Sequence, residues 1–270
     1  MNDHPRALTT LDFPAMKQAG RKIVSLTAYD ALAARILDEC GVDLILVGDS
    51  VNQVVAGKST TLSATLDQMI YHGRAVRGAV QHALVVIDLP FLTYQVTVED
   101  AIRNAGLVLQ KTGAQAVKLE GGTTMAPTVR ALVERGIPVM GHIGLTPQSV
   151  HALGGYRVQG REVDAADRLM ADALALQEAG AFSVVLELVP AALAARITEA
   201  LSIPTVGIGA GAGCDGQVLV LPDLLGLNAG FRPKFLKRYA DLDGVIRGAV
   251  SAFSEDVRGG RYPGPEHGFE

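Results

Sequence analysis

Ionisable side chains lie at the ends of five short apolar runs in this sequence. One run, residues 114–119, carries Lys118 in its interior and is followed by Glu120. Side chains two residues apart on a β-strand share a face, so Lys118 and Glu120 are expected to point the same way. Charges on a buried strand face cost free energy, and an enzyme site is the usual reason to retain them. The other four runs end on Asp49, Asp88, His142 and Glu187.

Three of these residues are carboxylates on consecutive strand-like runs, Asp49, Asp88 and Glu120. Parallel α/β folds place their chemistry at the carboxyl ends of strands, so the three acids would be neighbours on one rim. Without a cation they would repel one another, and at least one would take up a proton. A site of this kind predicts Mg²⁺, for which Mn²⁺ or Co²⁺ could substitute. The alternative is that one or two of the acids cap helices or pair with a basic residue.

Lys118 would lie inside the mouth of the site, two residues before Glu120. It could bind an anionic group of a substrate or stabilise a developing oxyanion. A buried salt bridge to one of the acids is the structural alternative. A Schiff base is a third option, which the adjacent metal disfavours because the metal already supplies an electrophile.

Three further polar residues complete the predicted site. Glu187 is expected across the mouth from the metal acids and is the candidate general base, unless it caps the helix after Pro190. His142 could hydrogen-bond a substrate carboxylate or a metal-bound water, or it could be a packed neutral histidine. Ser50 could offer its hydroxyl or amide to an anion, or it could cap a helix or loop.

The elements that must position these residues are eight strands alternating with helices. Strands are predicted at 23–26, 43–48, 84–88, 116–120, 137–142, 183–187, 204–208 and 218–221. Helices are predicted at 31–40, 66–81, 98–111, 123–135, 164–179, 190–201 and about 233–257. This alternation predicts a single (β/α)8 TIM barrel domain over residues 1–270, with a short N-terminal helix and a loosely held tail. The last crossover is short, and a helical turn over 214–217 is expected to complete it.

Three glycine-rich stretches would surround the mouth. The long loops 51–65 and 144–161 are candidates for shielding a reactive intermediate from water. Residues 207–211 could be mistaken for a dinucleotide motif, but no long helix and no suitably spaced acidic residue follow. Backbone amides lining one wall of the mouth are the expectation there.

The bulk composition excludes several classes of function. The 270 residues are 49% hydrophobic but only 5% aromatic, which favours an aliphatic core of parallel strands. The net charge of 24 − 28 = −4 gives no support for nucleic acid or an anionic membrane as partner. No apolar run reaches the roughly 18 residues of a membrane helix, and no signal peptide is visible. We expect a cytoplasmic protein in which both cysteines, Cys40 and Cys214, are reduced.

The motifs around these residues resemble those of the ketopantoate hydroxymethyltransferase family. The matching blocks are Leu26-Thr27-Ala28-Tyr29-Asp30, Val47-Gly48-Asp49-Ser50, Asp88-Leu89-Pro90-Phe91, Val117-Lys118-Leu119-Glu120-Gly121-Gly122, Gly141-His142-Ile143-Gly144-Leu145-Thr146-Pro147-Gln148, Leu186-Glu187, Gly207-Ile208-Gly209-Ala210-Gly211 and Asp215-Gly216-Gln217-Val218-Leu219-Val220. The resemblance covers about residues 8–257 in one order, with no departure at the motif positions.

The resemblance implies a barrel of the phosphoenolpyruvate mutase/isocitrate lyase-like superfamily. It also implies transfer of a hydroxymethyl group from 5,10-methylenetetrahydrofolate to 3-methyl-2-oxobutanoate, through a Mg-stabilised enolate, giving 2-dehydropantoate for pantothenate and coenzyme A synthesis. Such enzymes are cytoplasmic homo-oligomers, often decamers.

Site roles carry over residue by residue. By the resemblance, one Mg²⁺ per subunit is held by Asp49, Asp88 and Glu120. The 2-oxo acid is bound by Asp49, Ser50, Asp88 and Lys118, with His142 as a polar residue on the substrate side. Glu187 is the implied catalytic base.

Two other functions remain as alternatives. One is a lyase or mutase on 2-oxo acids of the phosphoenolpyruvate mutase and isocitrate lyase type. Several of those enzymes use a loop cysteine beside Lys and Gly, which this sequence lacks. The other is a non-catalytic ligand-binding barrel, which an assay of turnover would distinguish from an enzyme.

Overall fold

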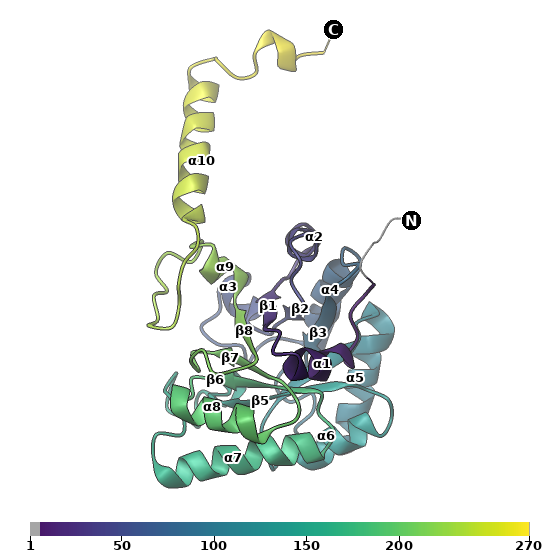
Figure 1. Cartoon of the computed structure of the whole chain (residues 1–270). Helices are drawn as coiled ribbons and strands as arrows, with labels where there is room; N and C mark the ends of the chain where they lie inside the picture. The colour runs from purple at the N-terminus through teal and green to yellow at the C-terminus, as the bar shows by residue number, and fades with distance from the viewer. Residues whose placement is uncertain (1–5, 270) are drawn as a thin grey trace. The chain divides into compact units, whose positions relative to one another are not determined.

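Eight parallel strands close into a barrel in the computed structural model, which describes residues 6–269 (Figure 1). Each strand pairs with the next one along the chain, and β8 pairs with β1 to close the circle. The strands are β1 (Ile23–Thr27), β2 (Leu44–Val47), β3 (Leu84–Asp88), β4 (Ala116–Glu120), β5 (Val139–Gly144), β6 (Ser183–Glu187), β7 (Thr205–Ile208) and β8 (Gly216–Leu219). The predicted (β/α)8 barrel is confirmed.

Helices precede, connect and follow these strands (Figure 1). They are α1 (Asp12–Gln18), α2 (Ala31–Glu39), α3 (Val51–Val54), α4 (Leu66–Arg77), α5 (Val98–Thr112), α6 (Ala126–Val133), η1 (Pro147–Ser149), α7 (Val163–Glu178), α8 (Ala191–Ala200), α9 (Leu221–Leu224), α10 (Leu242–Arg258) and η2 (Pro265–His267). Within residues 6–269, none of them has both the length and the apolar composition that crossing a membrane requires.

The chain divides into two compact units. Met1–Val220 contains the barrel, and Leu221–Glu270 contains α9, α10 and η2. A single domain over residues 1–270 was expected, of which residues 1–5 and 270 lie outside the described part. The barrel itself is complete in the first unit, because β8 ends at Leu219. That the two units form one domain stays a prediction.

The strand sequences suit burial on both faces. Every residue of β3 and of β4 is buried, including Asp88, Lys118 and Glu120. Aliphatic residues fill the remaining positions of these two strands, as is usual where helices cover the outside of a parallel sheet. The polar residues of the two strands are therefore exceptions within an apolar core, and they are concentrated at the carboxyl ends.

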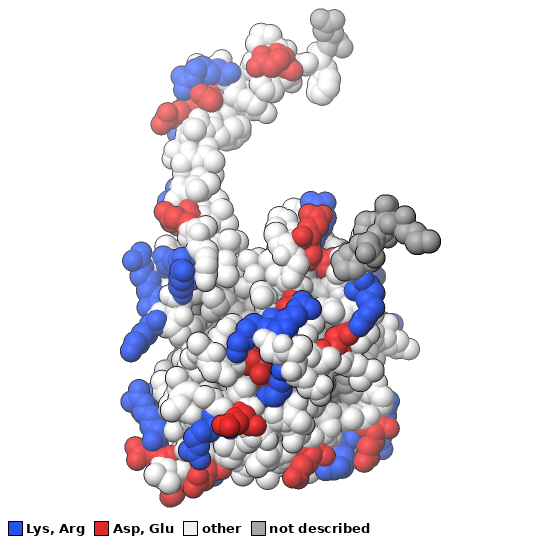
Figure 2. Space-filling model, viewed as in Figure 1, with Lys and Arg blue, Asp and Glu red and all other residues white. Residues whose placement is uncertain are grey.

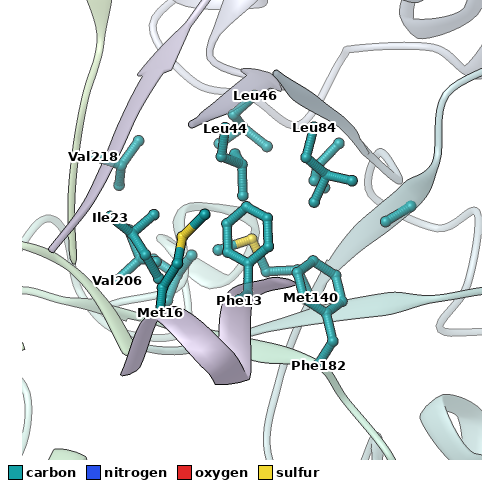
Figure 3. Packing of buried hydrophobic residues seen from close by; sticks show 13 residues of the cluster. Phe13, Met16, Ile23, Leu44, Leu46, Leu84, Met140, Phe182, Val206 and Val218 are labelled. Carbon is teal, nitrogen blue, oxygen red and sulfur yellow. The ribbon is translucent and has the colours of Figure 1, made fainter. Parts of the chain in front are cut away.

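Helix α1 closes the amino-terminal end of the barrel. Phe13 and Met16 of α1 pack among the first residues of the strands, including Ile23, Leu44 and Leu84 (Figure 3). Phe13 also meets Phe182 edge to face, with ring centroids 5.8 Å apart. This end of the barrel is thus an apolar core, and the ionisable residues lie toward the opposite end.

Two helices are shorter than predicted. Helix α4 ends at Arg77 rather than at residue 81. Beyond this end, the Asp38 carboxylate accepts hydrogen bonds from the backbone amides of Gln81, His82 and Ala83. Helix α6 begins at Ala126 rather than 123, because residues 123–125 form a turn.

The predicted range of the fifth strand was shifted. Strand β5 begins at Val139, after Pro138, which has no amide hydrogen to donate to a neighbouring strand. It continues to Gly144, which pairs with Glu187. His142 is therefore inside the strand and not at its tip.

The helical turn expected over residues 214–217 is wrong. Gly216 and Gln217 already belong to β8, and the chain reaches them from β7 without a helix. The Asp215 carboxylate accepts from the amide of Thr205 at 2.9 Å and pairs with Lys17 at 2.9 Å. These contacts fix the short connection in place of a helical turn.

Other loops also differ from expectation. The predicted loop 51–65 begins with the single helical turn α3, and the loop 144–161 contains η1. In the second unit, the helix predicted from about 233 begins only at Leu242, where Asp241 caps it through the amide of Gly244. Both cysteines are free, as predicted, with Cys214 buried and Cys40 exposed.

Candidate active site

The structure gathers the predicted polar residues at the carboxyl ends of neighbouring strands. Asp88, Glu120 and Glu187 are the last residues of β3, β4 and β6, and Asp49 follows β2 by two residues. Lys118 and His142 lie further inside, on β4 and β5. All except Glu187 are buried by residue accessibility, and the Glu187 side chain is only 17% exposed.

Asp49 and Asp88 are held together through the backbone. The Asp49 amide donates to Asp88 Oδ2 at 3.0 Å. Gly48 leaves room for the neighbouring serine, because a Cβ at that position would lie 2.7 Å from Ser50 Oγ. A side chain at Gly48 would therefore displace the serine hydroxyl.

Lys118 is the cation nearest to the acids. Its Nζ lies 2.9 Å from Asp88 Oδ1. Burial lowers the pKa of Lys118, but the charges of Asp88, Glu120 and Asp49 outweigh it and hold the pKa above its ordinary value. Lys118 is therefore an ammonium, and the alternative of a buried ion pair is realised in this structure. A neutral amine, as Schiff-base formation requires, is disfavoured here.

One ammonium does not neutralise the acids. Burial, and then the charge of Asp88, raises the pKa of Asp49 to about 7. Burial, and then the charge of Asp49, raises the pKa of Glu120 well above its ordinary value. The expected repulsion among the three carboxylates is therefore present, and it favours either protonation or a further cation.

The three carboxylates offer oxygen ligands for a metal ion, but their side chains do not converge. In the part of the chain that the structure describes, no group of three or more His, Cys, Asp or Glu is assembled so that it could hold a metal ion. The buried Glu120 Oε1 nevertheless has no hydrogen-bond donor, and Asp88 Oδ1 has only the ion pair with Lys118. The donor set is entirely oxygen, which suits a hard cation such as Mg²⁺. The residue types thus fit the ion, although the three side chains are not arranged around one point.

His142 connects Lys118 with Glu187. Its Nδ1 lies 3.1 Å from Lys118 Nζ, and its Nε2 lies 3.2 Å from Glu187 Oε2, although not aligned as a hydrogen bond. Burial, and then the charge of Lys118, lowers the pKa of His142 well below its ordinary value, so the ring is neutral. Since an ammonium can only donate, Nδ1 is the acceptor and Nε2 carries the proton.

Glu187 lies beside this histidine, a contact that the sequence did not predict. Burial raises its pKa to about 7, although the charge of Lys118 lowers it in part. Its backbone is fixed from both sides: Leu145 donates to the Glu187 carbonyl at 2.8 Å, and the next residue, Leu188, has φ 47°. No capping bond from Glu187 to α8 is present, since Pro190 occupies the N-cap position without a side-chain bond.

The ends of β5 and β6 pack closely at Gly144 and Glu187. A Cβ on Gly144, which has φ +93°, would lie 2.2 Å from the Glu187 carbonyl oxygen. Only glycine allows both this backbone conformation and this contact. Gly144 therefore has a geometric role in placing the carboxylate next to His142.

Ser50 lies at the start of α3 but does not cap it with its side chain. Its Oγ lies 2.8 Å from the phenol oxygen of Tyr29, which follows β1. The predicted alternative of a simple helix cap is thus wrong. The hydroxyl is partly buried and lies directly after Asp49.

Sequence reasoning missed the role of two buried residues, Gln148 and Tyr94. Gln148 lies in η1, and its side chain and backbone amide reach Asp49 and Glu120 respectively, both at 2.9 Å. Tyr94 donates to Gln148 Oε1 at 2.7 Å. The available signal was the Thr-Pro-Gln sequence within a glycine-rich loop, which marked an unusual turn but indicated no partner.

The two long loops meet above these strand ends. Gln53 Nε2 in α3 donates to the Tyr156 phenol at 3.0 Å. Burial raises the pKa of Tyr156, and the nearby charges of Glu187, Asp49 and Glu120 add to this shift. The contact joins loop 51–65 to loop 144–161, as a shielding role requires.

The sequence matches the ketopantoate hydroxymethyltransferase family model over residues 7–265. The chain belongs to this family. A 3-methyl-2-oxobutanoate hydroxymethyltransferase of Pelobacter propionicus is 56% identical over 269 residues, covering 100% of both chains. One of Geobacter sulfurreducens is 56% identical over 264 residues, covering 98% of this chain and 99% of the relative. The family predicted from the motifs is confirmed.

The predicted barrel is similar to solved structures of the phosphoenolpyruvate mutase/isocitrate lyase superfamily. A phosphoenolpyruvate phosphomutase from Streptomyces platensis superposes with a TM-score of 0.63 at 15% identity, covering 94% of this chain and 88% of that one. A 2,3-dimethylmalate lyase superposes with a TM-score of 0.61 at 16% identity, covering 96% and 93%. At such low identity the similarity establishes the fold alone.

Proposed function

We propose that this chain transfers a hydroxymethyl group from 5,10-methylenetetrahydrofolate to 3-methyl-2-oxobutanoate. The products are 2-dehydropantoate and tetrahydrofolate, and the step serves pantothenate and coenzyme A synthesis. The observation that carries the proposal is the row Lys118–His142–Glu187, in which a cation, a neutral imidazole and a carboxyl group with pKa about 7 lie in contact distance. The family membership of the chain supports the choice of substrates.

Glu187 is the proposed general base. A base works best when its pKa is close to the working pH, and the Glu187 pKa of about 7 meets this condition. Its carboxylate would take the C3 proton of the 2-oxo acid. The carbanion so formed is delocalised as an enolate, and it attacks the one-carbon unit of the folate. The two carbon–nitrogen bonds to that carbon break, one water molecule supplies the hydroxyl group, and the two folate nitrogens take the proton from Glu187 and the remaining proton of the water.

Lys118 and His142 would act on the oxygen atoms of the same substrate. The Lys118 ammonium is buried, where a fixed charge stabilises a developing oxyanion more strongly than it would in water. The Nε2 of the neutral His142 lies 3.2 Å from Glu187 Oε2 without an aligned hydrogen bond, so its proton is free to meet a substrate oxygen, and the ring places no second positive charge beside the base. Ser50, Asp49 and Asp88 complete the proposed set that binds the 2-oxo acid.

We propose one Mg²⁺ per subunit, bound by the carboxylates of Asp49, Asp88 and Glu120. The buried Glu120 Oε1 without a donor and the raised pKa values of Asp49 and Glu120 support an additional cation here. A bound Mg²⁺ would polarise the keto group of the substrate and acidify its C3 hydrogen. Among similar folds, a phosphonopyruvate hydrolase was solved in complex with oxalate and Mg²⁺, at a TM-score of 0.60 and 13% identity.

The surroundings of the site agree with this chemistry. The contact between Gln53 and Tyr156 would help to exclude water while the enolate exists. On the face drawn in Figure 2, basic and acidic side chains are interspersed, which agrees with small-molecule substrates and not with nucleic acid as partner. We also propose that the enzyme is a cytoplasmic homo-oligomer, as family members are.

A coupled turnover assay tests the function. The purified chain is incubated with 3-methyl-2-oxobutanoate, 5,10-methylenetetrahydrofolate and Mg²⁺, and 2-dehydropantoate is measured by mass spectrometry. We expect product in proportion to enzyme, and much less after treatment with EDTA. A folded chain that binds the 2-oxo acid but forms no product would instead be a ligand-binding barrel.

A further inference from the structure

Gln148 uses all of its hydrogen-bonding groups within the site. Its Nε2 donates to Asp49 Oδ2 and to the Leu89 carbonyl, both at 2.9 Å. Its Oε1 accepts from the Tyr94 hydroxyl at 2.7 Å and from Gln95 Nε2 at 2.9 Å. The Gln148 backbone amide donates to Glu120 Oε2 at 2.9 Å. A buried glutamine satisfied on every side is fixed in one orientation.

These bonds fix the direction of the amide group. Two obligate acceptors face Nε2, so turning the amide over would place its oxygen against Asp49 Oδ2 and the Leu89 carbonyl. Tyr94 supplies one of the donors to Oε1 and is itself anchored, because its hydroxyl accepts from the Glu120 amide at 3.0 Å. The orientation of Gln148 thus depends on the end of β4.

The residue joins two strands and one loop. Asp49 follows β2 and Glu120 ends β4, and Gln148 binds a carboxylate of each with a different donor. It is part of η1, so the start of loop 144–161 is held by the same bonds. An amide has no charge, so it can bridge two carboxylates without adding to the negative charge of the cluster.

We propose that Gln148 is a positioning residue that sets the separation of Asp49 and Glu120 for the cation and links ion binding to the order of loop 144–161. This role rests on the proposed function, since it concerns the same Mg²⁺. Residues that orient metal ligands typically change metal affinity by about 10- to 100-fold when they are removed. Tyr94 acts through Gln148 and is expected to have a smaller effect of the same kind.

The first test is Mg²⁺ affinity measured by calorimetry without substrate, on Gln148→Leu and on a control, Gln159→Leu. Gln159 lies in the same loop, but its side chain donates only to the Arg157 carbonyl among the described contacts. We expect an affinity about 10- to 100-fold weaker for Gln148→Leu and nearly unchanged for the control. Circular dichroism at the temperature of the titration verifies that both variants are folded.

The second test is amide hydrogen exchange over residues 146–156, with and without Mg²⁺. In the wild type, Mg²⁺ should slow exchange in this segment, and in Gln148→Leu that effect should be lost. Tyr94→Phe, which keeps the ring and removes only the hydroxyl, provides a milder variant if Gln148→Leu does not fold. In the double variant the two effects should be less than additive, because both act through one amide.

The outcomes separate this role from the proposed function. Binding of Mg²⁺ by the wild type, with the same affinity in folded Gln148→Leu or Tyr94→Phe and the same exchange pattern, would overturn the positioning role and leave the proposed function intact. A wild type that binds no Mg²⁺ at millimolar concentration would overturn the proposed ion and this role together. A lower melting temperature with unchanged Mg²⁺ affinity would make Gln148 a purely structural residue.

Discussion

A single neutral histidine separates the buried ammonium of this site from the carboxyl group of the candidate base. His142 lies between the Lys118 ammonium and the Glu187 carboxyl, and its low pKa keeps positive charge away from the base. A carboxylate beside an imidazolium would be a weaker base, because an adjacent positive charge lowers its pKa. The residues therefore form two groups: Asp49, Asp88 and Glu120 with one cation, and Glu187 with none in direct contact.

Glu187→Gln should remove the base and preserve the shape of the site. We expect exchange of the C3 hydrogen of 3-methyl-2-oxobutanoate with solvent to fall by about 10²- to 10⁴-fold, as is usual for loss of a general base. Nuclear magnetic resonance in deuterium oxide measures the exchange. Glu178→Gln, at the exposed end of α7, is the matched control. Exchange at the wild-type rate in Glu187→Gln would show that another group takes the proton.

The pH dependence of the same exchange reports on the ionisation of Glu187. Only the carboxylate accepts a proton, so the rate should rise with pH, reach half of its plateau near pH 7 and level off above it. The groups that act on Glu187 are His142, which is neutral, and Lys118, whose charge lowers the Glu187 pKa.

Lys118→Met should therefore move this profile to higher pH, since the charge that favours the carboxylate is gone. The plateau should also fall by about 10²- to 10³-fold through loss of oxyanion stabilisation. Lys111→Met, at the exposed end of α5, removes an equal charge far from the site and should leave the profile unchanged. A profile that moves to lower pH in Lys118→Met would contradict the assigned electrostatics.

At the scale of elements, the two ends of the barrel differ in polarity. The amino-terminal end is filled by α1 and an apolar cluster, whereas the carboxyl-terminal end carries buried charges that cost stability. Packing at one end thus compensates for polar groups at the other. Strand length matters too, because extension of β5 to Gly144 brings Leu145 into contact with the Glu187 carbonyl.

Phe13→Ala should reveal this contribution of α1. Phe13 is fully buried and contacts Phe182, so its truncation should lower the free energy of unfolding by about 3–5 kcal/mol. Urea unfolding followed by circular dichroism measures the loss. Leu11→Ala, two residues earlier at the N-cap of α1 and on a side chain that is 83% exposed, should change it by less than about 0.5 kcal/mol. Equal losses in the two variants would mean that α1 does not close the barrel in this way.

At the scale of the whole molecule, helix α10 carries apolar side chains that remain exposed in this chain. None of its residues is buried, yet one side carries Val245, Ile246, Val250, Phe253 and Val257. An isolated helix of this length is marginally stable in water, and an exposed apolar stripe usually marks an interaction surface. The stripe supports the proposed homo-oligomer without indicating its size.

Phe253→Glu places a charge at the centre of that stripe. If the stripe is buried between subunits, the variant should sediment as smaller species than the wild type, because an unpaired buried charge is costly. Sedimentation velocity at several concentrations distinguishes the two. Ser251→Glu adds the same charge on the opposite side of α10 and should sediment like the wild type. A Phe253→Glu variant of unchanged mass would exclude the stripe from the interface.

The sequence by itself determined the barrel, the family and the identity of the polar residues at its carboxyl end. These follow from local patterns: aliphatic runs of strand length, ionisable residues at their ends, and glycines at fixed offsets. Helix capping is equally local: the Thr97 side chain accepts from the amide of Asp100, three residues further on.

Only the tertiary structure decided which of these residues touch. The contact between Glu187 and His142 was not predicted, because it depends on the register in which β5 and β6 pair, with Gly144 opposite Glu187. Gln148 is 99 positions away from Asp49 in the sequence, and no local pattern reveals a hydrogen bond between them. Ionisation was likewise decided by the fold, since burial and the summed charges of several strands, and not the residue type, set each pKa.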